Sequence, residues 1–552
     1  MKTFSKAMLA GLMIAVSVLP GLQAKAQSDP EPAIVICMAP LKEQMKDIGY
    51  IAEAAGFGQM SFLIKMQMEQ FLKGIDTENP SGVLMYLGED QKEPRAIGFL
   101  PISDMEQFLE IVDQYAKVEE GADLTTIIPD SGPELLMKEV NGYAYFSDRE
   151  EMFEFLPNDP VGLAGDLPEN YNIGAKVFAQ RIPASLRESW LDEIEDSYAK
   201  SIEEMGGLPS DVQEQNFEMQ MKTIRSLINE TEEMVIGLAA NSTTESMYID
   251  LQMTGLEGSK IANESATQEG IEASKFSSLL MDEATFTANI CVEISEEDAK
   301  QQLAMLGSLR DELADELNDS DMTDKELEMA ESIADDMFEV FKDTVEEGRM
   351  DVAMVVNTGE DQTDFAIGFQ VSDARKLEDA VKDLARMAEN EPGFGEVVEF
   401  NLNSGTLEGL QLHEVVVQLA SSPPEVTDYL GDELTLLLAI GKKEIYIVGS
   451  SDDPMVLLKE AVNPNNANEN EQVMMQYNLF LGPLLEMSSA IEGDEMTEKM
   501  SDLLAETGKD RIRLDAQWIK NGFKGRFDIQ DGVLGLIGVS MENFGLMGGA
   551  EF

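Results

Sequence analysis

The sequence predicts an α+β protein made of internally duplicated β-α-α-β-β units, with antiparallel sheets and helical pairs packed on one face. One observation is that the run Ala-Ile-Gly-Phe, closely followed by Ser-Asp, occurs at residues 96–104 and again at 366–373. In both copies an apolar strand pattern leads into a helix N-cap, because Ser and Asp side chains accept hydrogen bonds from the first helical N–H groups. A second observation is that the same order of predicted elements occurs four times, which is typical of duplication.

The first unit opens on a predicted strand over residues 33–39. Pro40 then stands where the first residue of a helix is expected, a position that favours proline. Apolar residues recur at helical spacing over 41–52 and again over 60–75. Strands are predicted over the two stretches 83–87 and 95–101.

The same order returns from residues 173, 285 and 473. Two of the later helices carry a capping-box pattern, Ser210-x-x-Gln213 and Thr323-x-x-Glu326. The opening strands are predicted over 173–180, 285–294 and 473–481. The paired closing strands are predicted over 233–240 and 246–253, over 350–356 and 365–371, and over 511–519 and 523–529.

The first and third units carry an extension with a hairpin and further strands. We expect the hairpin turns at 129–132 and 403–405, where Ser-Gly occurs in both. If the units are equivalent, residues 33–118 should superpose on 287–388. Ile97 should then match Ile367, and Phe99 should match Phe369.

The chain is too long for a single ordinary core, so we expect several domains. Stretches rich in Pro, Gly and Asn indicate where the joints lie. The expected division is a signal peptide over 1–26, a first long unit over 27–165, a first short unit over 166–280, a second long unit over 281–463 that repeats the first, and a second short unit over 464–552 that ends in a loose Gly-rich tail.

The first residues have the pattern of a secretory signal peptide. A basic start with Lys2 and Lys6 precedes an apolar run over 8–19, and Ala24-Lys25-Ala26 is a cleavage signal. The run is too short for a permanent membrane anchor, and no later stretch is apolar for long enough to span a bilayer. We therefore expect cleavage after Ala26 and a soluble protein in the bacterial periplasm or exterior.

The composition is extremely acidic, with 39 Lys and Arg against 106 Asp and Glu and a net charge of −67. Loss of the three lysines before residue 27 would make the net charge −70. Such a surface repels nucleic acid and anionic lipid, and it attracts cations without specificity. We interpret the charge chiefly as an adaptation for solubility.

The sequence lacks most of the motifs of common enzymes. His413 is the only histidine, which excludes a His-rich metal site and makes any Ser-His-acid triad depend on that residue. It lies in a strand pattern, and we expect it at the surface. There is no G-x-S-x-G elbow and no phosphate-binding loop.

Two further motifs are more economically explained as turns. Asp130-Ser-Gly is similar to the active-site sequence of aspartic proteases, but the corresponding residue of the other hairpin is Asn403, which cannot supply the second carboxylate. Residues 319–324 resemble the start of a calcium loop, but the turn glycine is missing and Ala330 stands where the closing glutamate should be. We therefore assign no catalytic, cofactor-binding or metal-binding residue.

Two other features leave alternatives open. Cys37 and Cys291 occupy matching strand positions, so they are either a disulfide pair or two buried thiols. The 34 methionines either fill the core or line a soft apolar groove.

We expect an exported, non-enzymatic binding or structural protein with an unknown protein or small-molecule partner and no cofactor. The alternatives are an extracellular hydrolase that uses a pair of carboxylates, and a carrier that holds an apolar ligand between helix and sheet. An open cleft with converging buried carboxylates would favour the hydrolase, and a closed cavity lined by methionine would favour the carrier.

Overall fold

The computed structural model divides the chain into two compact units, which are described separately. Unit 1 comprises residues up to Asn263 together with Lys520–Phe552, and unit 2 comprises Glu264–Ile519. Both contain helices and antiparallel strands, so the predicted α+β class is confirmed. The structure describes residues 31–58, 66, 68, 70–88, 95–205, 210–318, 322–359, 363–390, 397–420, 422, 427, 430–450, 452–463, 473–492 and 495–543. Three predicted features lie wholly or partly outside these residues: the signal peptide, residues 319–321 of the calcium-like stretch 319–324, and the Gly-rich tail from 544.

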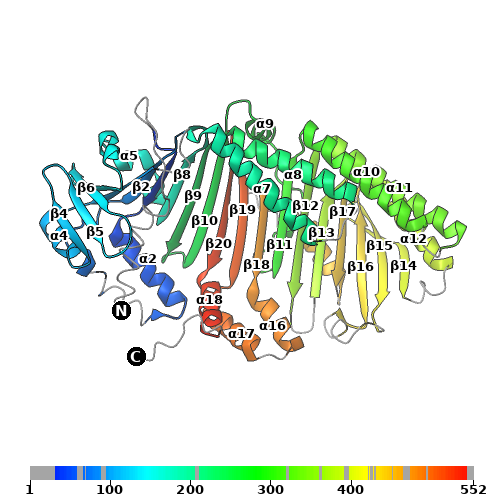
Figure 1. Ribbon diagram of the computed structural model, residues 1–552. Coiled ribbons are helices and arrows are strands. Elements are labelled where there is room, and N and C mark those ends of the chain that lie inside the picture. Colours follow the sequence, from blue (N-terminus) through cyan, green and yellow to red (C-terminus); the bar gives the residue numbers. More distant parts are fainter. Residues whose placement is uncertain are drawn as a thin grey trace. The chain divides into compact units, whose positions relative to one another are not determined.

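The strands of unit 1 that the structure describes form an antiparallel sheet in the order β4-β5-β6-β7-β3-β2-β1-β8-β9-β10-β20 (Figure 1). Strand β20 comes from the far end of the chain and pairs with β10 along its length. The strand bounds are β1 Ile34–Met38, β2 Ser81–Tyr86, β3 Arg95–Pro101, β4 Ala116–Glu120, β5 Thr125–Pro129, β6 Leu135–Val140, β7 Tyr143–Ser147, β8 Ile173–Phe178, β9 Thr231–Asn241, β10 Ser246–Gly255 and β20 Gly522–Gln530. The helices are α2 Leu41–Ala54, α4 Met105–Val112, η1 Glu150–Phe155, α5 Pro160–Ala164, α6 Leu167–Asn170, η2 Ala179–Arg181, α7 Ala184–Met205, α8 Ser210–Glu230 and α18 Asp531–Asn543.

Unit 2 has an antiparallel sheet in the order β14-β15-β16-β17-β13-β12-β11-β18-β19. Helix α9 (Lys260–Thr267) spans the boundary between the units. The strand bounds are β11 Phe286–Glu293, β12 Arg349–Thr358, β13 Thr363–Gln370, β14 Val398–Leu407, β15 Leu410–Gln418, β16 Glu433–Ile440, β17 Glu444–Ser450, β18 Val473–Phe480 and β19 Arg511–Ile519. The helices are η3 Ser277–Leu279, α10 Glu296–Asn318, α11 Asp324–Glu347, α12 Ala374–Asn390, α15 Pro454–Ala461, α16 Leu481–Glu492 and α17 Glu495–Thr507.

Several helix starts follow from the residues that cap them. The Asp104 carboxylate accepts a hydrogen bond from the Gln107 N–H at 3.1 Å, which confirms the predicted N-cap of α4. The capping box predicted at Thr323 is present, and the Thr323 N–H donates to Glu326 Oε2 at 2.6 Å. Such caps satisfy N–H groups that have no partner within the helix.

The matched phenylalanines of the two Ala-Ile-Gly-Phe copies do not occupy equivalent positions. Phe99 lies in the same buried cluster as Cys37. Phe369 pairs with Val352, whereas Cys291 pairs with the residue before Val352, so the side chains of Phe369 and Cys291 point to opposite faces. The predicted match of the phenylalanines, and that of the isoleucines two residues earlier, is wrong. Relative to the cysteines, the two copies differ by one residue in register, which reverses the sheet face.

The second predicted hairpin turn is also wrong. Asn403, Ser404 and Gly405 lie inside β14, where the register shifts between Asn401 and Gly405 as at a β-bulge. The chain turns instead after Leu407, where Gly409 has a φ of +92°. Asn403 itself adopts a φ of +57°, a conformation that asparagine tolerates better than most residues.

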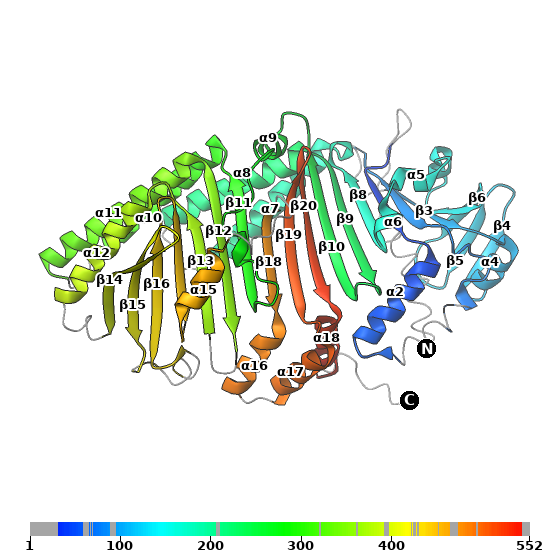
Figure 2. The same cartoon turned by 180° about the vertical axis from the view of Figure 1, so that it is seen from behind.

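Unit 2 has helical cover on both faces of its sheet. On one face, η3 and α15 cover Ala353, Val355 and Ala366, and Figure 2 shows α15 lying across β13 and β16. We call this the strap face, after the segment 271–282 that lies on it and contains η3. On the other face, α11 and α12 pack against Ile445 and Phe369. No helix among the described residues is long and apolar enough to cross a membrane.

Replacing Gly368 with Ala is expected to destabilise unit 2 by about 2 kcal/mol, because overpacking of a dense core is costly. A Cβ atom at Gly368 would lie 2.4 Å from Cδ1 of the buried Phe276 ring. Gly405→Ala, on another strand of the same sheet, is the matched control. A Cβ atom at Gly405 would lie 3.6 Å from its nearest neighbour, Leu412 Cδ1, which is an ordinary contact distance. Urea denaturation of both variants tests this, and equal midpoints would contradict it.

Candidate functional site

Four adjacent strands of unit 1, β8, β9, β10 and β20, expose apolar side chains on one face. The pairing aligns Ile173, Leu238, Ile249 and Phe527 in one row across the four strands. These four side chains are between 36% and 44% exposed. Ile236 and Leu251, at 42% and 37%, form part of the neighbouring row.

The apolar character continues over the whole face and onto β1. Because side chains alternate along a strand, residues two apart share this face. The residues at these positions are apolar, and on β9 this character ends at Met234, because the next residue of the series, Glu232, is charged and exposed at the edge of the face. We call this surface the open face. Its residues are Ile34, Ile36 and Met38 of β1, Ile173, Ala175 and Val177 of β8, Met234, Ile236, Leu238 and Ala240 of β9, Met247, Ile249, Leu251 and Met253 of β10, and Phe523, Gly525, Phe527 and Ile529 of β20.

The opposite face of the same strands is closed, with apolar residues such as Val235 and Ala239 on β9 and a buried polar cluster where β10 pairs with β20. Asp250 is 1% exposed there and accepts two hydrogen bonds from Arg526, at 2.6 and 2.8 Å. The Lys524 ammonium lies 3.1 Å from the same carboxylate, and the Tyr171 hydroxyl donates to it at 3.0 Å. The Arg526 guanidinium also stacks on the Tyr248 ring. These partners satisfy the buried charge, so the cluster joins β10 to β20.

The titration of Asp250 reflects this environment. Burial by itself would raise the pKa of the carboxyl group, but the hydrogen bonds from Arg526 and Lys524 outweigh burial and lower it. For Tyr171, burial and the neighbouring Asp250 carboxylate both raise the pKa of the hydroxyl. Asp250 therefore stays ionised in the folded protein at neutral pH.

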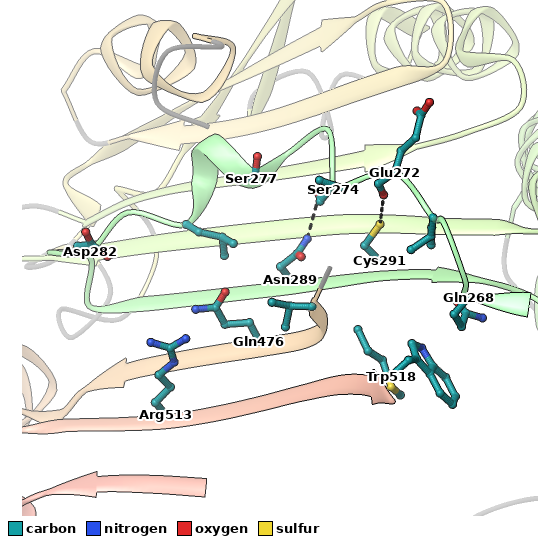
Figure 3. Close-up of a pocket in the computed structure, with 15 residues that line it drawn as sticks. Gln268, Glu272, Ser274, Ser277, Asp282, Asn289, Cys291, Gln476, Arg513 and Trp518 are labelled. Atoms are coloured by element: carbon teal, nitrogen blue, oxygen red, sulfur yellow. Dashed lines mark hydrogen bonds between the residues drawn. The ribbon is translucent and has the colours of Figure 1, made fainter. Parts of the chain in front are cut away.

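A separate cavity of about 300 Å³ lies in unit 2, on the strap face. Its floor is formed by β11, β18 and β19, and one wall is formed by residues 271–282, which run beside β11 and lie over β12 (Figure 3). We call this wall the strap. The lining residues are Gln268, Ile271, Glu272, Ala273, Ser274, Ser277, Leu280, Asp282, Asn289, Cys291, Val473, Met474, Gln476, Arg513 and Trp518.

The strap is held by a fully buried carboxylate. Asp351 accepts hydrogen bonds from the Ser274 hydroxyl at 2.5 Å and from the Lys275 N–H at 2.9 Å. The Asn289 amide in turn donates to the Ser274 hydroxyl at 3.0 Å. Arg349 lies 3.4 Å from Asp351 and completes the charge pair. The sheet thus fixes the height of the strap above the floor.

The floor carries polar side chains in two cross-strand rows. Residues Thr287, Asn478 and Arg513 form one row. Residues Asn289, Gln476 and Asp515 form the other.

Two acceptor atoms on this floor lack a donor. The Arg513 and Asp515 side chains form an ion pair at 2.5 Å. The Asn478 Oδ1 and the second Asp515 oxygen, Oδ1, are buried and accept no hydrogen bond within the described protein. Buried acceptors without a partner are costly, so a donor supplied from the cavity would stabilise them.

Cys291 lines this cavity but is poorly suited to act as a nucleophile. Burial, and next the nearby Asp351 carboxylate, raise the pKa of its thiol to about 11. Burial likewise raises the pKa of the Cys37 thiol to about 12. Both cysteines are free thiols in the structure.

A second cavity of about 400 Å³ lies beside the start of α15. Its lining includes Asp452 and Asp453 together with Leu412 and Leu437 from the sheet. Asp453 is occupied as the N-cap of α15, where it accepts from the Met455 N–H. We assign it no ligand.

Comparison of the chain with known protein families, characterised proteins and solved structures finds no match. The function must therefore be argued from the two surfaces above, the open face and the cavity under the strap.

The expected surface position of His413 is wrong. The residue is on β15 as predicted, but it is fully buried. Its Nδ1 accepts from the Asn403 N–H at 3.3 Å, and its Nε2 lies 3.7 Å from the Glu378 carboxylate of α12. Burial lowers the pKa of the imidazole, against the opposing effect of Glu378. Its role here is to fill the space beneath α12, so truncation costs more stability than a surface position would.

The other singled-out residues are not brought together. Asp130 is exposed in the turn between β5 and β6, and Asn403 lies in the bulge of β14. Among the residues that the structure describes, no group of three or more His, Cys, Asp or Glu is placed to hold a metal ion. Sequence reasoning missed Asp250 and Asp351, because among 106 acidic residues nothing local distinguishes a buried one.

Proposed function

We propose that this protein is an exported, acidic, non-enzymatic binding protein of the bacterial periplasm or exterior. In this proposal the open face of unit 1 binds an amphipathic helix of a partner protein, and basic residues flank the apolar stripe of that helix. The observation that carries the proposal is the row of large apolar side chains, each more than a third exposed, on adjacent strands.

The exposure of these side chains supports a binding role because it is concentrated. Single exposed apolar residues are ordinary, but a contiguous patch marks an interaction surface. Burial of apolar area contributes roughly 25 cal/mol per Å², so covering this face would supply a substantial driving force.

A helix is the occupant that the fold itself uses on such a surface. In unit 2, α11 and α12 lie on apolar strand residues such as Ile445 and Phe369. Helix α12 also shows the charge pattern that we propose for the partner, because Lys376 forms ion pairs with Glu339 and Asp343 on α11, at 2.9 and 3.2 Å. Peptide recognition by laying an amphipathic helix into an apolar groove is a recurrent mode of binding.

Charge determines the sign of the flanking residues. The chain carries a net charge of −67, so an acidic partner is repelled and a basic one is attracted. The open face itself carries no charged residue at its described positions, so attraction acts at the rim and apolar contact acts at the centre.

Substituting Leu238→Gln and Ile249→Gln together is expected to weaken binding of a basic amphipathic helix at least about tenfold, the loss for about 1.4 kcal/mol. These residues are direct cross-strand neighbours at the centre of the face. The probe is a labelled Leu-Lys peptide of helical periodicity, measured by fluorescence anisotropy at physiological salt. Val456→Gln is the control variant, since Val456 is an isolated apolar residue, 56% exposed, on α15.

Two control ligands decide what the face recognises. A scrambled peptide of the same composition should bind at least tenfold more weakly than the helical one. Equal binding of both peptides, or an unaffected double variant, would refute the helix proposal. If an uncharged long-chain amphiphile binds to the open face and the helical peptide does not, the carrier function replaces it. The four methionines of the face, Met38, Met234, Met247 and Met253, favour that second candidate, because methionine adapts to varied apolar ligands.

We also propose that the two units arose by duplication. The support is the strand order, because β14-β15-β16-β17-β13-β12-β11-β18-β19 repeats β4-β5-β6-β7-β3-β2-β1-β8-β9 position by position. In this alignment Cys37 corresponds to Cys291, and the two Ala-Ile-Gly-Phe runs lie in equivalent strands, β3 and β13, one residue out of register. The four-part division of the chain stays a prediction.

A further inference from the structure

We infer that the cavity under the strap of unit 2 is a binding site for a neutral, polyhydroxylated small molecule of the size of a mono- or disaccharide. This inference is independent of the open face, which lies in unit 1. It rests on the lining of the cavity, on the acceptors beneath it and on its electrostatics.

The polar groups that face the cavity are mainly amides and hydroxyls. Gln476 projects from the centre of the floor, and no hydrogen bond to its amide is found among the described residues (Figure 3). Ser277 adds a hydroxyl from the strap, and Asn289 adds an amide oxygen from β11, because its NH2 group already donates to the Ser274 hydroxyl and to the Val352 carbonyl oxygen. Amides and hydroxyls both donate and accept, which is the pattern that vicinal hydroxyl groups of a ligand require.

Two acceptor atoms on the same floor have no hydrogen-bond donor among the described residues. Asn478 Oδ1 and Asp515 Oδ1 are buried without a donor, and they belong to the two polar rows that include Gln476 and Arg513. An interior polar surface normally satisfies such atoms. Neither residue lines the cavity itself, so a ligand rich in hydroxyl donors supplies what these atoms lack through a bridging water beside Gln476 and Arg513, which do line it.

The charges around the cavity do not suit a charged ligand. An anion would need a free cation, but Arg513 is already paired with Asp515 at 2.5 Å. Two further carboxylates, those of Glu272 and Asp282, lie exposed among the lining residues and repel anions. A cation would need a free buried carboxylate, but Asp515 and Asp351 are already paired with Arg513 and Arg349. A neutral ligand avoids both conflicts.

The shape and size of the cavity suit a ligand with flat apolar ring faces. The Trp518 indole lies at one end of the cavity beside Gln268, so it offers an apolar surface next to the polar floor (Figure 3). Gln268 is fixed there because its amide exchanges two hydrogen bonds with the backbone of Glu293, at 2.6 and 2.8 Å. A volume of about 300 Å³ is at the lower end of ligand cavities, which limits the ligand to one or two sugar rings.

The test uses the full mature protein and titration calorimetry. The probes are glucose, galactose, mannose, maltose and cellobiose, with glucosamine as the cationic control and glucuronate as the anionic control. At least one neutral sugar should bind with a Kd below about 1 mM, and both charged analogues should bind at least about tenfold more weakly. No binding by any neutral sugar, or binding by a charged analogue alone, would overturn the inference.

Location is tested by variants and by fluorescence. Gln476→Met should weaken sugar binding about tenfold, whereas Gln252→Met on β10 should leave it unchanged, because it makes the same substitution in unit 1, outside the cavity. Because the chain has two tryptophans, Trp190→Phe leaves Trp518 as the only indole, and its emission should change on sugar binding. Binding without an emission change in this variant, and without an effect of Gln476→Met, would place the sugar elsewhere and refute the site.

Discussion

Replacing Asp250 with Ala is expected to destabilise unit 1 by about 3 kcal/mol. The substitution removes a buried carboxylate and leaves Arg526 and Lys524 side by side without their counter-charge, which is the costly way to break a buried ion pair. This loss of stability is at the lower end for buried ion pairs, because the Arg526 side chain is 40% exposed and water screens its charge. Urea denaturation followed by circular dichroism measures the effect. Glu232→Ala, an exposed acid on neighbouring β9, is the control and should change stability by less than about 0.5 kcal/mol.

The pH dependence of this effect has a defined sign. The folded-state pKa of Asp250 is lowered, so its stabilising contribution is present above the unfolded value of about 3.9 and is lost as pH falls through the folded value. The stability difference between the wild-type protein and Asp250→Ala should therefore be constant near neutral pH and shrink below about pH 4. A difference that grows on acidification would contradict this account. A second control is Asp250→Met combined with Arg526→Met, which should be more stable than Asp250→Ala because it removes one of the two unpaired charges.

Replacing Asp351 with Ala is expected to cost about 3 kcal/mol in unit 2 and to release the strap. The carboxylate is fully buried, and its loss leaves the Lys275 N–H and the Ser274 hydroxyl without their acceptor and Arg349 without its buried counter-charge. Asp351→Asn should have a smaller effect, because the amide oxygen can still accept one of these hydrogen bonds.

Hydrogen exchange distinguishes release of the strap from general destabilisation. The Lys275 amide should lose its protection in Asp351→Ala under conditions where amides in β16 keep theirs. Glu399→Ala, an exposed acid on β14, is the control and should leave Lys275 protected. Unchanged protection of Lys275 in Asp351→Ala would contradict this account and would show that the remaining contacts of the strap, those of Arg349, Phe276 and Leu279, suffice to hold it.

Register is the first feature that local sequence did not reveal. The strand leading to Phe99 and the strand leading to Phe369 were both predicted, but which face each side chain takes depends on pairing with strands that lie tens of residues away in the chain. A shift of one residue reverses the face, and the four letters Ala-Ile-Gly-Phe carry no information about the partner strand. The bulge in β14 has the same origin, because Asn403 and Gly405 suit a turn as well as a bulge.

The sequence by itself determined the local elements: the apolar periods that mark strands and helices, the caps at Asp104 and Thr323, and the α+β class. These depend on contacts within a few residues, which the chain order already specifies. Only the tertiary structure decided that Asp250 and Asp351 are buried among many exposed acids, that His413 lies beneath α12, and which apolar strand face keeps large side chains more than a third exposed. The physical reason is that burial and charge pairing are set by residues far apart in the chain, as Asp250 and Arg526 are, and no local pattern records which distant partner arrives.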